Sequence, residues 1–343
     1  MRVNGSPLTY AKAGVDITKV AKIHKKIDSI LSKTFNTRSG KTGEPLNIRQ
    51  HYAGLIEISR DKALAVHTDG VGTKVLIAEA CQRYDTIGID CVAMNVNDVI
   101  CVGAEPIALV NYLALEYPQP QLVEQVMMGL KHGAQSAGIA IVSGETAIMP
   151  DVIRGFDLAA TVIGIVNKTE IITGEEAEKG DVILGLRSSG IHSNGLTLAR
   201  KVLLKSRPHP DVLRELLRPT RIYVDDILKI ISSRVEIHGL AHITGGAYSK
   251  LSRIGARANV GFNLDTMPKP HRIFSVIQKK GKVSDREMYR TFNMGIGFLL
   301  VCPRRYYRMA KTILPALTQI GEVTGTRDVT IRTSGHDIQI EKW

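Results

Sequence analysis

The stretch His67-Thr68-Asp69-Gly70-Val71-Gly72-Thr73-Lys74 stands between two apolar runs, 63–66 and 75–78. The first run predicts a strand, and residues 75–80 predict the first turns of a helix. Gly70 and Gly72 let the backbone take positive φ and approach a ligand closely. Free N–H groups at a helix start also favour anions. The order of strand, glycine loop and helix therefore predicts an α/β layer with a ligand at the loop.

The same stretch carries residue types that a phosphate and metal site needs. Asp69 would hold a cation that bridges phosphate oxygens, and Lys74 would act on the same phosphates as a point charge. The alternative is a plain strand-to-helix turn in which Asp69 only caps the helix. Two familiar nucleotide motifs are excluded: the order is Gly-Thr-Lys rather than Gly-Lys-Thr, and a dinucleotide fingerprint needs glycine where Val75 stands.

Length predicts two domains, because 343 residues exceed one hydrophobic core of ordinary size. The polar segment 167–180 is punctuated by glycines, and we place the boundary there. The predicted units are an N-terminal domain, 1–168, and a C-terminal domain, 169–343. In the first unit, strands alternate with helical patterns, which indicates an α/β class.

The net charge of +12 favours acidic partners such as nucleotides or phosphorylated metabolites. A nucleic-acid-binding module is the alternative. However, the basic residues are spread along the chain, and aromatic residues make up only 5%, which leaves few stacking platforms. We therefore expect no nucleic-acid partner. The densest basic run lies on a predicted amphipathic helix, 17–32, and a solvated face explains it.

Cys81, Cys91, Cys101 and Cys302 lack C-x-x-C spacing and stand in apolar surroundings. This indicates buried thiols in a reducing compartment rather than disulfides or zinc. The longest apolar run, 158–166, is too short to span a bilayer, and no N-terminal apolar signal segment is present. We expect a cytoplasmic protein with no membrane partner.

Residues 86–103 form the best-defined predicted helix. Its apolar residues fall in one stripe, Asn95 and Asp98 lie on the opposite side, and Asp90 and Asn97 flank the stripe. Asn95 and Asp98 either face water or offer their face to a metal-phosphate site. A short strand, 139–142, is expected to stop at the turn Ser143-Gly144-Glu145-Thr146. Such a position is common for ligand contacts, although a turn with an exposed glutamate is the alternative.

The second half repeats this pattern. The strand 182–186 leads into Ser188-Ser189-Gly190-Ile191-His192-Ser193-Asn194-Gly195 and a predicted helix, 196–204, which together predict an anion site. His192 would donate to a phosphate or move a proton, although a lone loop histidine usually does neither. His238 and His242 have zinc spacing, but Gly245-Gly246 ends any helix there, and we reject zinc. Thr244-Gly245-Gly246 indicates close backbone approach to a ligand.

Two further segments leave alternatives open. Residues 34–47 are expected to be a mobile loop, and residues 10–16 are either a linker or a lid over a ligand. Arg290 and Asn293 precede the predicted strand 298–301 and would either reach a substrate or hold a turn.

Eight strings, in order along the chain, together resemble the phosphoribosylformylglycinamidine cyclo-ligases, also called aminoimidazole ribonucleotide synthetases. They are Asp69-Gly70-Val71-Gly72-Thr73-Lys74, Thr86-Ile87-Gly88-Ile89-Asp90, Val96-Asn97-Asp98, Gly103-Ala104-Glu105-Pro106, Gly144-Glu145-Thr146-Ala147, Ser188-Ser189-Gly190-Ile191-His192-Ser193-Asn194-Gly195, His238-Gly239-Leu240-Ala241-His242-Ile243-Thr244-Gly245-Gly246 and Met288-Tyr289-Arg290-Thr291-Phe292-Asn293. The likeness covers nearly the whole chain.

The resemblance implies an enzyme that uses ATP and Mg²⁺ to close the imidazole ring in purine biosynthesis, with a phosphorylated ribonucleotide as substrate. It implies a homodimer in which the N-terminal mixed sheet pairs with its partner's. The chemistry implied is phosphorylation of a formyl oxygen, attack by a nearby nitrogen, and release of ADP and phosphate. Catalysis of phosphoryl transfer is mostly positioning and charge neutralisation.

The resemblance, together with the residue types, assigns a role to each candidate. The metal ligands would be Asp69, Asp98 and Glu145. ATP would bind to Asp69, Gly70, Val71, Gly72, Thr73, Lys74, Asn95, Gly144, Glu145 and Thr146. The substrate phosphate would bind to Ser189, Gly190, Ser193, Asn194, Thr244, Gly245 and Gly246. The catalytic residues would be Lys74, Asp90 and His192.

Two departures and one competing family matter. Related superfamily members carry a metal-binding aspartate in the segment that here reads Ile243-Thr244-Gly245-Gly246, which leaves the metal count open. The segment 35–46 is short and basic for a lid. The alternative within the superfamily, selenophosphate synthetase chemistry, would need a reactive cysteine near the N-terminus, and no cysteine precedes Cys81.

Overall fold

Two β-sheets organise the chain in the computed structural model, which describes residues 9, 13–14, 17–48, 51–204, 209–333 and 335–340. The first sheet has the order β1-β2-β5-β3-β4. Its strands are β1 (Gly54–Glu57), β2 (Lys62–Gly70), β3 (Glu105–Leu115), β4 (Ala140–Ile148) and β5 (Phe156–Asn167). Only β3 and β4 are parallel to each other, so the sheet is mixed as expected.

The helices α3 (Asp85–Ile100) and α4 (Pro120–Ala137) cover one face of this sheet. Buried and half-exposed residues alternate along β5, because one side of the strand packs on the helices. The two helices touch at glycines: a Cβ on Gly88 would lie 2.1 Å from the Leu130 nitrogen of α4. The remaining elements of this half are α1 (Ile17–Leu31), η1 (Ser32–Arg38), η2 (Gly72–Lys74), α2 (Val75–Cys81) and η3 (Lys168–Glu170).

The local predictions for the first half are partly confirmed. The helices predicted at 17–32 and 75–80 are α1 and α2, and the apolar run 158–166 lies within β5. The predicted turn at 143–146 is wrong, because pairing with β3 carries β4 through it to Ile148. Likewise β2 continues through residues 67–70, and η1 forms inside the segment predicted to be a loop. The possible lid, 10–16, lies largely outside the described residues.

Seven strands form the second sheet, in the order β12-β11-β8-β10-β6-β9-β7. They are β6 (Val182–Arg187), β7 (Gly239–His242), β8 (Gly261–Leu264), β9 (Ile296–Cys302), β10 (Thr318–Thr324), β11 (Val329–Arg332) and β12 (Asp337–Ile340). β8 and β11 run parallel and the other neighbours antiparallel, so this sheet is also mixed. The strand predicted at 182–186 is β6.

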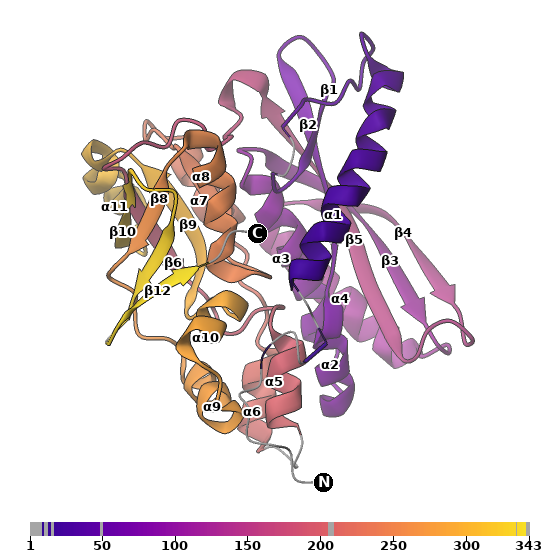
Figure 1. Cartoon of the computed structure of the whole chain (residues 1–343). Helices are drawn as coiled ribbons and strands as arrows, with labels where there is room; N and C mark the ends of the chain where they lie inside the picture. The colour runs from indigo at the N-terminus through magenta and orange to yellow at the C-terminus, as the bar shows by residue number, and fades with distance from the viewer. Residues whose placement is uncertain are drawn as a thin grey trace.

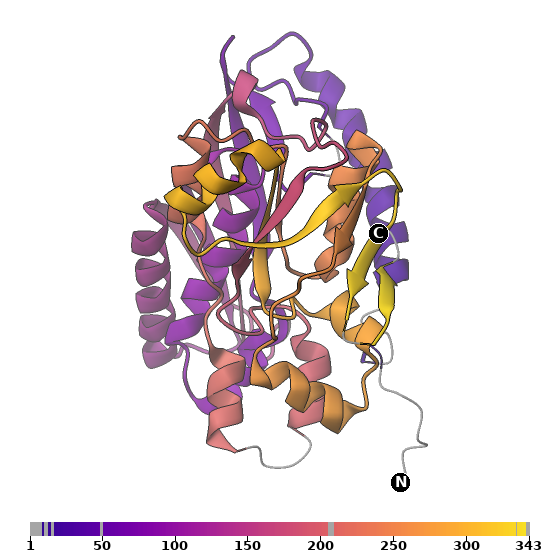
Figure 2. The ribbon, with the colours of Figure 1, turned by 90° about the vertical axis from the view of Figure 1, so that its left-hand side faces the viewer.

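Helices surround this second sheet: α5 (Leu196–Leu203), α6 (Pro210–Leu217), α7 (Val224–Ile231), η4 (Ala247–Lys250), α8 (Leu251–Ala258), α9 (Arg272–Gly281), α10 (Asp285–Thr291), η5 (Arg304–Tyr306) and α11 (Tyr307–Ile313). The two sheets lie on opposite sides of α3, which contacts β2, β3 and β5 of the first half and α7 and β7 of the second (Figure 1). In Figure 2 the second half lies in front of the first. α3 therefore serves both halves of the molecule.

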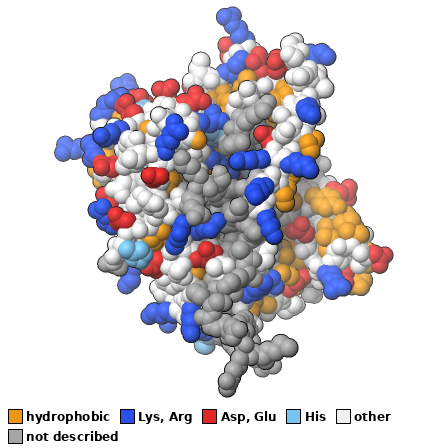
Figure 3. All heavy atoms as spheres, viewed as in Figure 1, with side chains coloured by type: hydrophobic (Ala, Val, Ile, Leu, Met, Phe, Trp, Pro, Cys, Tyr) orange, Lys and Arg blue, Asp and Glu red, His pale blue; other side chains and the backbone are white. Residues whose placement is uncertain are grey.

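β4 forms the outer edge of the first sheet, and its residues are exposed on both sides. Apolar side chains gather around it, as Figure 3 shows on the right of the molecule; they include Ile107, Tyr112, Ile141, Val142 and Ile148. The four lysines of α1 predicted to face solvent, Lys19, Lys22, Lys25 and Lys26, are exposed. None of the described helices combines the length and apolar character needed to cross a bilayer.

Candidate functional site

The middle of α3 fixes the carboxyl end of β2. Asn95 accepts a hydrogen bond from the Asp69 nitrogen at 2.9 Å and donates one to the Asp69 carbonyl at 3.0 Å. Asp98 follows one helical turn later, and its charge acts on the Asp69 carboxyl. Asn95 and Asp98 do not face water: both are buried, at 0% and 6% exposure. The structure thus brings Asp69, Asn95 and Asp98 together.

Asp98 is held by residues from both halves of the chain. His242 Nδ1 lies 2.6 Å from Asp98 Oδ1, and His67 Nε2 lies 3.6 Å from Asp98 Oδ2. Burial opposes ionisation of Asp98, but the Lys250 charge and the His242 hydrogen bond hold its pKa below the ordinary value. The His242 ring accepts from Asn97 Nδ2 at its other nitrogen, so the neutral tautomer with hydrogen on Nδ1 fits both contacts.

The Asp69 side chain lies on the face of the first sheet that α3 covers, and it is half-buried. Its Oδ1 accepts from the Gly70 nitrogen, so it does not cap a helix. Burial, and secondarily the Asp98 charge, raise the pKa of Asp69. Two repelling carboxylates in a largely buried place would be relieved by a divalent cation, and oxygen ligands suit Mg²⁺. No cluster of three or more His, Cys, Asp or Glu side chains in the described ranges is placed to hold a metal alone. Phosphate oxygens and water would therefore have to complete the coordination.

Lys74 and Asp90 meet in the interior rather than at an open loop. Both side chains are 0% exposed, and Lys74 Nζ lies 2.8 Å from Asp90 Oδ1 and 2.7 Å from Oδ2. The Oδ2 contact is a close charge pair without hydrogen-bond alignment. The same ammonium donates to the Arg218 carbonyl at 2.8 Å. Burial lowers the pKa of Lys74, and Asp90 opposes this shift.

Asp90 also binds the second half of the chain. Its Oδ1 accepts from Thr220 N at 2.7 Å, from Thr220 Oγ1 at 2.6 Å and from Ser193 Oγ at 3.0 Å. Two turns along α3, Asn97 donates to the Arg221 carbonyl and accepts from the Tyr223 nitrogen. The segment 218–223 is therefore clamped along one face of α3.

The two predicted anion loops lie side by side. A Cβ on Gly245 would lie 3.0 Å from Asn194 Oδ1, which places the 244–246 turn against the 189–194 loop. Asn194 also touches Met94 of α3, and Thr73 Oγ1 lies 3.1 Å from Thr197 Oγ1. The glycine loop of the first half and both glycine loops of the second therefore surround one region of α3.

Two hydroxyls predicted to bind the substrate phosphate already have partners. Ser189 donates to the Pro219 carbonyl at 2.6 Å, and Ser193 is bound to Asp90. Asn293 holds the same loop, since it accepts from Ser188 Oγ and donates to the Gly190 carbonyl. Asn293 thus holds a turn, which was one of its two predicted roles.

His192 lies beneath its loop, fully buried. Its Nε2 accepts from the Ser189 nitrogen, and its Nδ1 has no partner among the described residues. Burial lowers the pKa of His192 well below the ordinary value, so the ring is neutral at pH 7. A Cβ on Gly297 of β9 would lie 2.6 Å from the ring. The ring therefore packs toward β9, and a catalytic role for it stays a prediction.

Glu145 is not brought to Asp69 and Asp98 within one chain. Across the first sheet, Glu145 pairs with Tyr112, Tyr112 pairs with Ala159, and Ala159 pairs with Gly70. Asp69 is the neighbour of Gly70 in β2 and so belongs to the adjacent set of paired residues. Successive residues of a strand point to opposite faces, so Glu145 points away from α3, three strands and ~14 Å from Asp69. A shared metal is excluded inside one chain by this geometry, and a role across two chains stays a prediction. Gly144 and Thr146 lie on the same edge strand.

Four residues at the site were not predicted from the sequence. His67 lies 3.6 Å from Asp98, and Lys250 donates to Thr244 Oγ1. The Lys250 ammonium and the Arg253 guanidinium each lie 5.1 Å from the centre of the Tyr52 ring. His67 stands inside the opening stretch, and Lys250 follows the Thr244 turn by six residues. Only the packing of the two halves reveals that these side chains share a site.

His238 and His242 lie on β7 rather than on a helix. Paired carboxylates, not a shared metal, surround His238: Asp181 lies 2.6 Å from Nδ1 and Glu236 lies 3.0 Å from Nε2. The four cysteines are free, and three of them are buried.

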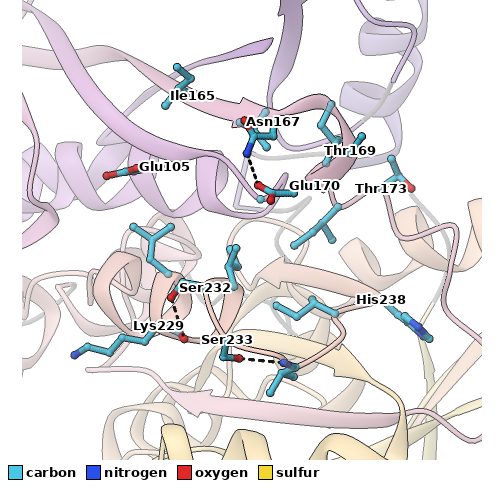
Figure 4. A pocket seen from close by; sticks show the side chains of 18 of the residues that line it. Glu105, Ile165, Asn167, Thr169, Glu170, Thr173, Lys229, Ser232, Ser233 and His238 are labelled. Atoms are coloured by element: carbon cyan, nitrogen blue, oxygen red, sulfur yellow. Dashed lines mark hydrogen bonds between the residues drawn. The ribbon is translucent and has the colours of Figure 1, made fainter. Parts of the chain in front are cut away.

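A groove of about 1030 Å³ lies between the halves at the opposite end of β5 (Figure 4). Residues from β5, the connector and α7 line it; Figure 4 labels Glu105, Asn167, Glu170, Lys229, Ser232 and His238 among them. Neither Asp69 nor Asp98 reaches this groove. The site residues predicted from the sequence therefore lie elsewhere, around α3.

Two family matches cover most of the chain. Residues 50–166 match the N-terminal domain of AIR synthase related proteins, and residues 178–334 match the C-terminal domain. The phosphoribosylformylglycinamidine cyclo-ligase of Thermococcus kodakarensis is 48% identical over 96% of this chain and 99% of its own length. The enzyme of the same name from Pyrococcus furiosus is 52% identical over 90% of this chain and 91% of its own length.

Solved structures share the fold at lower identity. A hydrogenase maturation protein crystallised with ATP is 19% identical and has a TM-score of 0.63 over 82% of this chain and 85% of its own. The thiamine-monophosphate kinase of Stenotrophomonas maltophilia is 19% identical, with a TM-score of 0.62 over 87% of this chain and 94% of its own.

Proposed function

The chain belongs to the phosphoribosylformylglycinamidine cyclo-ligase family, and from this premise we propose how its residues share the reaction. It is an ATP-dependent ligase that makes aminoimidazole ribonucleotide in purine biosynthesis. The division of roles among the residues is our proposal. It rests on the convergence of Asp69, Asp98 and the loops at 189–194 and 244–246 around one segment of α3.

Asp69 and Asp98 hold Mg²⁺ in this proposal. Asp98 Oδ1 is taken by His242 and Asp69 Oδ1 by the Gly70 nitrogen, so the metal would bind to Asp69 Oδ2 and to Asp98 Oδ2 beside His67. Bound Mg²⁺ would neutralise charge on the ATP phosphates during transfer. Asn95 fixes the Asp69 backbone, and His242 fixes Asp98, so both carboxylates are pre-positioned before a nucleotide arrives.

The loops at 189–194 and 244–246 bind the substrate ribonucleotide. The Asn194 amide lies beside Gly245 and touches Met94 of α3, one residue before Asn95. In this proposal the substrate binds to the C-terminal half, beside a nucleotide bound to the N-terminal half. Phosphorylation of the formyl oxygen then makes it a leaving group, and the neighbouring amidine-side nitrogen closes the ring as phosphate departs.

We further propose a homodimer formed through the first sheet. β4 is an exposed edge strand, and Val142 on it is 63% exposed. Exposed apolar side chains beside an unpaired strand edge favour pairing with another chain. Free cysteines favour a reducing compartment, so a cytoplasmic location stays our prediction.

Isotope transfer tests the reaction most directly. The protein is incubated with formylglycinamidine ribonucleotide carrying ¹⁸O in the formyl group, together with ATP and Mg²⁺. We expect aminoimidazole ribonucleotide as product and the label in inorganic phosphate. Asp69→Asn and Asp98→Asn should abolish turnover while the circular dichroism spectrum is retained. Phosphate without label would refute formyl phosphorylation, and full activity of both variants would refute the metal assignment.

A further inference from the structure

We propose that Lys250 is the cation that contacts the transferred phosphoryl group, in the place that Lys74 would be expected to fill from the sequence. This inference rests on the proposed function of the site around Asp69 and Asp98. It assigns a substrate-contacting role to a residue that lies in the C-terminal half, far along the chain from the glycine loop.

Lys74 is enclosed by protein groups that a phosphate would have to displace. Its ammonium donates to Asp90 Oδ1 and to the Arg218 carbonyl, and Asp90 Oδ2 lies in charge contact with it at 2.7 Å. The side chain is 0% exposed. A nucleotide phosphate could reach Lys74 only by displacing these partners and opening the interface between the two halves.

Lys250 has free capacity at the right place. Its ammonium donates to Thr244 Oγ1, and among the described residues no second hydrogen-bond acceptor contacts it. It also lies over the face of Tyr52, 5.1 Å from the ring centre. A largely buried ammonium with open donors is costly unless a ligand completes its contacts.

The surroundings of Lys250 point to an anion bound beside the metal. The Lys250 charge acts on both Asp69 and Asp98, so the ammonium faces the two carboxylates from across the boundary between the halves. The Arg253 guanidinium is a second cation in contact with the Tyr52 ring. The Tyr52 hydroxyl is buried and has no partner among the described residues, so a further donor is present there. Two cations and a hydroxyl beside two metal-binding carboxylates fit a phosphoryl group that bridges metal and ammonium.

Lys250→Met removes the charge and keeps the apolar stem. We expect turnover to fall at least ~100-fold, as when a single donor to transition-state charge is removed. The second readout is the ratio of affinities for Mg-β,γ-methylene-ATP and Mg-ADP, measured by calorimetry. The wild type should prefer the triphosphate analogue, and Lys250→Met should lose that preference while ADP affinity stays the same. Lys250→Arg keeps the charge and should retain part of both.

Controls separate this inference from others. Lys229→Met removes an exposed lysine on α7 and should change neither readout. If Lys250→Met does not fold, Lys250→Gln and Lys250→Arg give the same comparison of neutral with charged side chains. Unchanged turnover or an unchanged affinity ratio in the neutral variant overturns the role of Lys250. A wild type that forms no aminoimidazole product overturns the proposed function itself.

Discussion

Lys74→Met tests whether the Lys74 and Asp90 pair joins the two halves of the molecule. The variant removes an ammonium that is 0% exposed and leaves the Asp90 carboxylate equally buried. Thr220 and Ser193 still donate to Asp90, but no positive charge remains in contact with it. Breaking a buried ion pair from one side costs about 3–5 kcal/mol, because an uncompensated charge stays behind. We expect the free energy of unfolding to fall by that amount.

The double variant Lys74→Met/Asp90→Asn shows whether the charge is the cause. An asparagine carries no charge and still offers an oxygen to Thr220 and Ser193, so it should recover about half of the loss. Unfolding is followed by circular dichroism in urea, with Lys229→Met as the matched control for loss of an exposed lysine. A loss below about 1 kcal/mol for Lys74→Met, or no recovery in the double variant, would refute the clamp.

Three other predictions use separate parts of the structure. Gly88→Ala should destabilise by about 3 kcal/mol or more, since its Cβ would lie 2.1 Å from the main chain of α4; thermal unfolding measures it, and an unchanged midpoint contradicts the packing. Burial opposes protonation of His238, but Glu236 and Asp181 raise the pKa of the ring above 6.5. Protonated His238 therefore stabilises the fold fully below pH 6.5, and this stabilisation is lost as pH rises through the raised pKa. Urea titrations of wild type and His238→Gln should therefore converge at high pH, and a constant difference would disprove this. Val142→Asp should convert the proposed dimer to monomers in analytical ultracentrifugation, while a dimer that persists in the variant would exclude β4 from the interface.

Local patterns predicted local structure well. The amphipathic periodicity of 17–32 and of 86–103 gave α1 and α3, because both depend on spacing within one segment. The turn at 143–146 was wrong because a neighbouring strand pairs with it, and pairing partners are distant in sequence. The sequence pattern singled out Asn95 and Asp98, yet their burial could not be foreseen. The face opposite the apolar stripe of α3 is covered by the second half of the chain.

The candidate site shows the same limit. Residue type and spacing indicated Asp69 and Asp98, and the structure brings them together. The local sequence predicted Lys74 at an open phosphate-binding loop. Nothing in that segment shows that Asp90 and the Arg218 carbonyl enclose its ammonium. Lys250 was missed because a lone lysine after a glycine turn has no distinctive pattern. The role that we propose for it depends on Thr244, Tyr52 and Asp98, which lie in three separate parts of the sequence.

The clamp of segment 218–223 on α3 has a consequence for biosynthesis of the chain itself. The ribosome makes α3 long before residues 218–223, so Asn97 first lacks its partners at 221 and 223, and Asp90 has Lys74 but not yet Thr220. During that interval the nascent N-terminal half carries a polar stripe that water must satisfy. The first half can therefore reach its final form only after translation has passed residue 223.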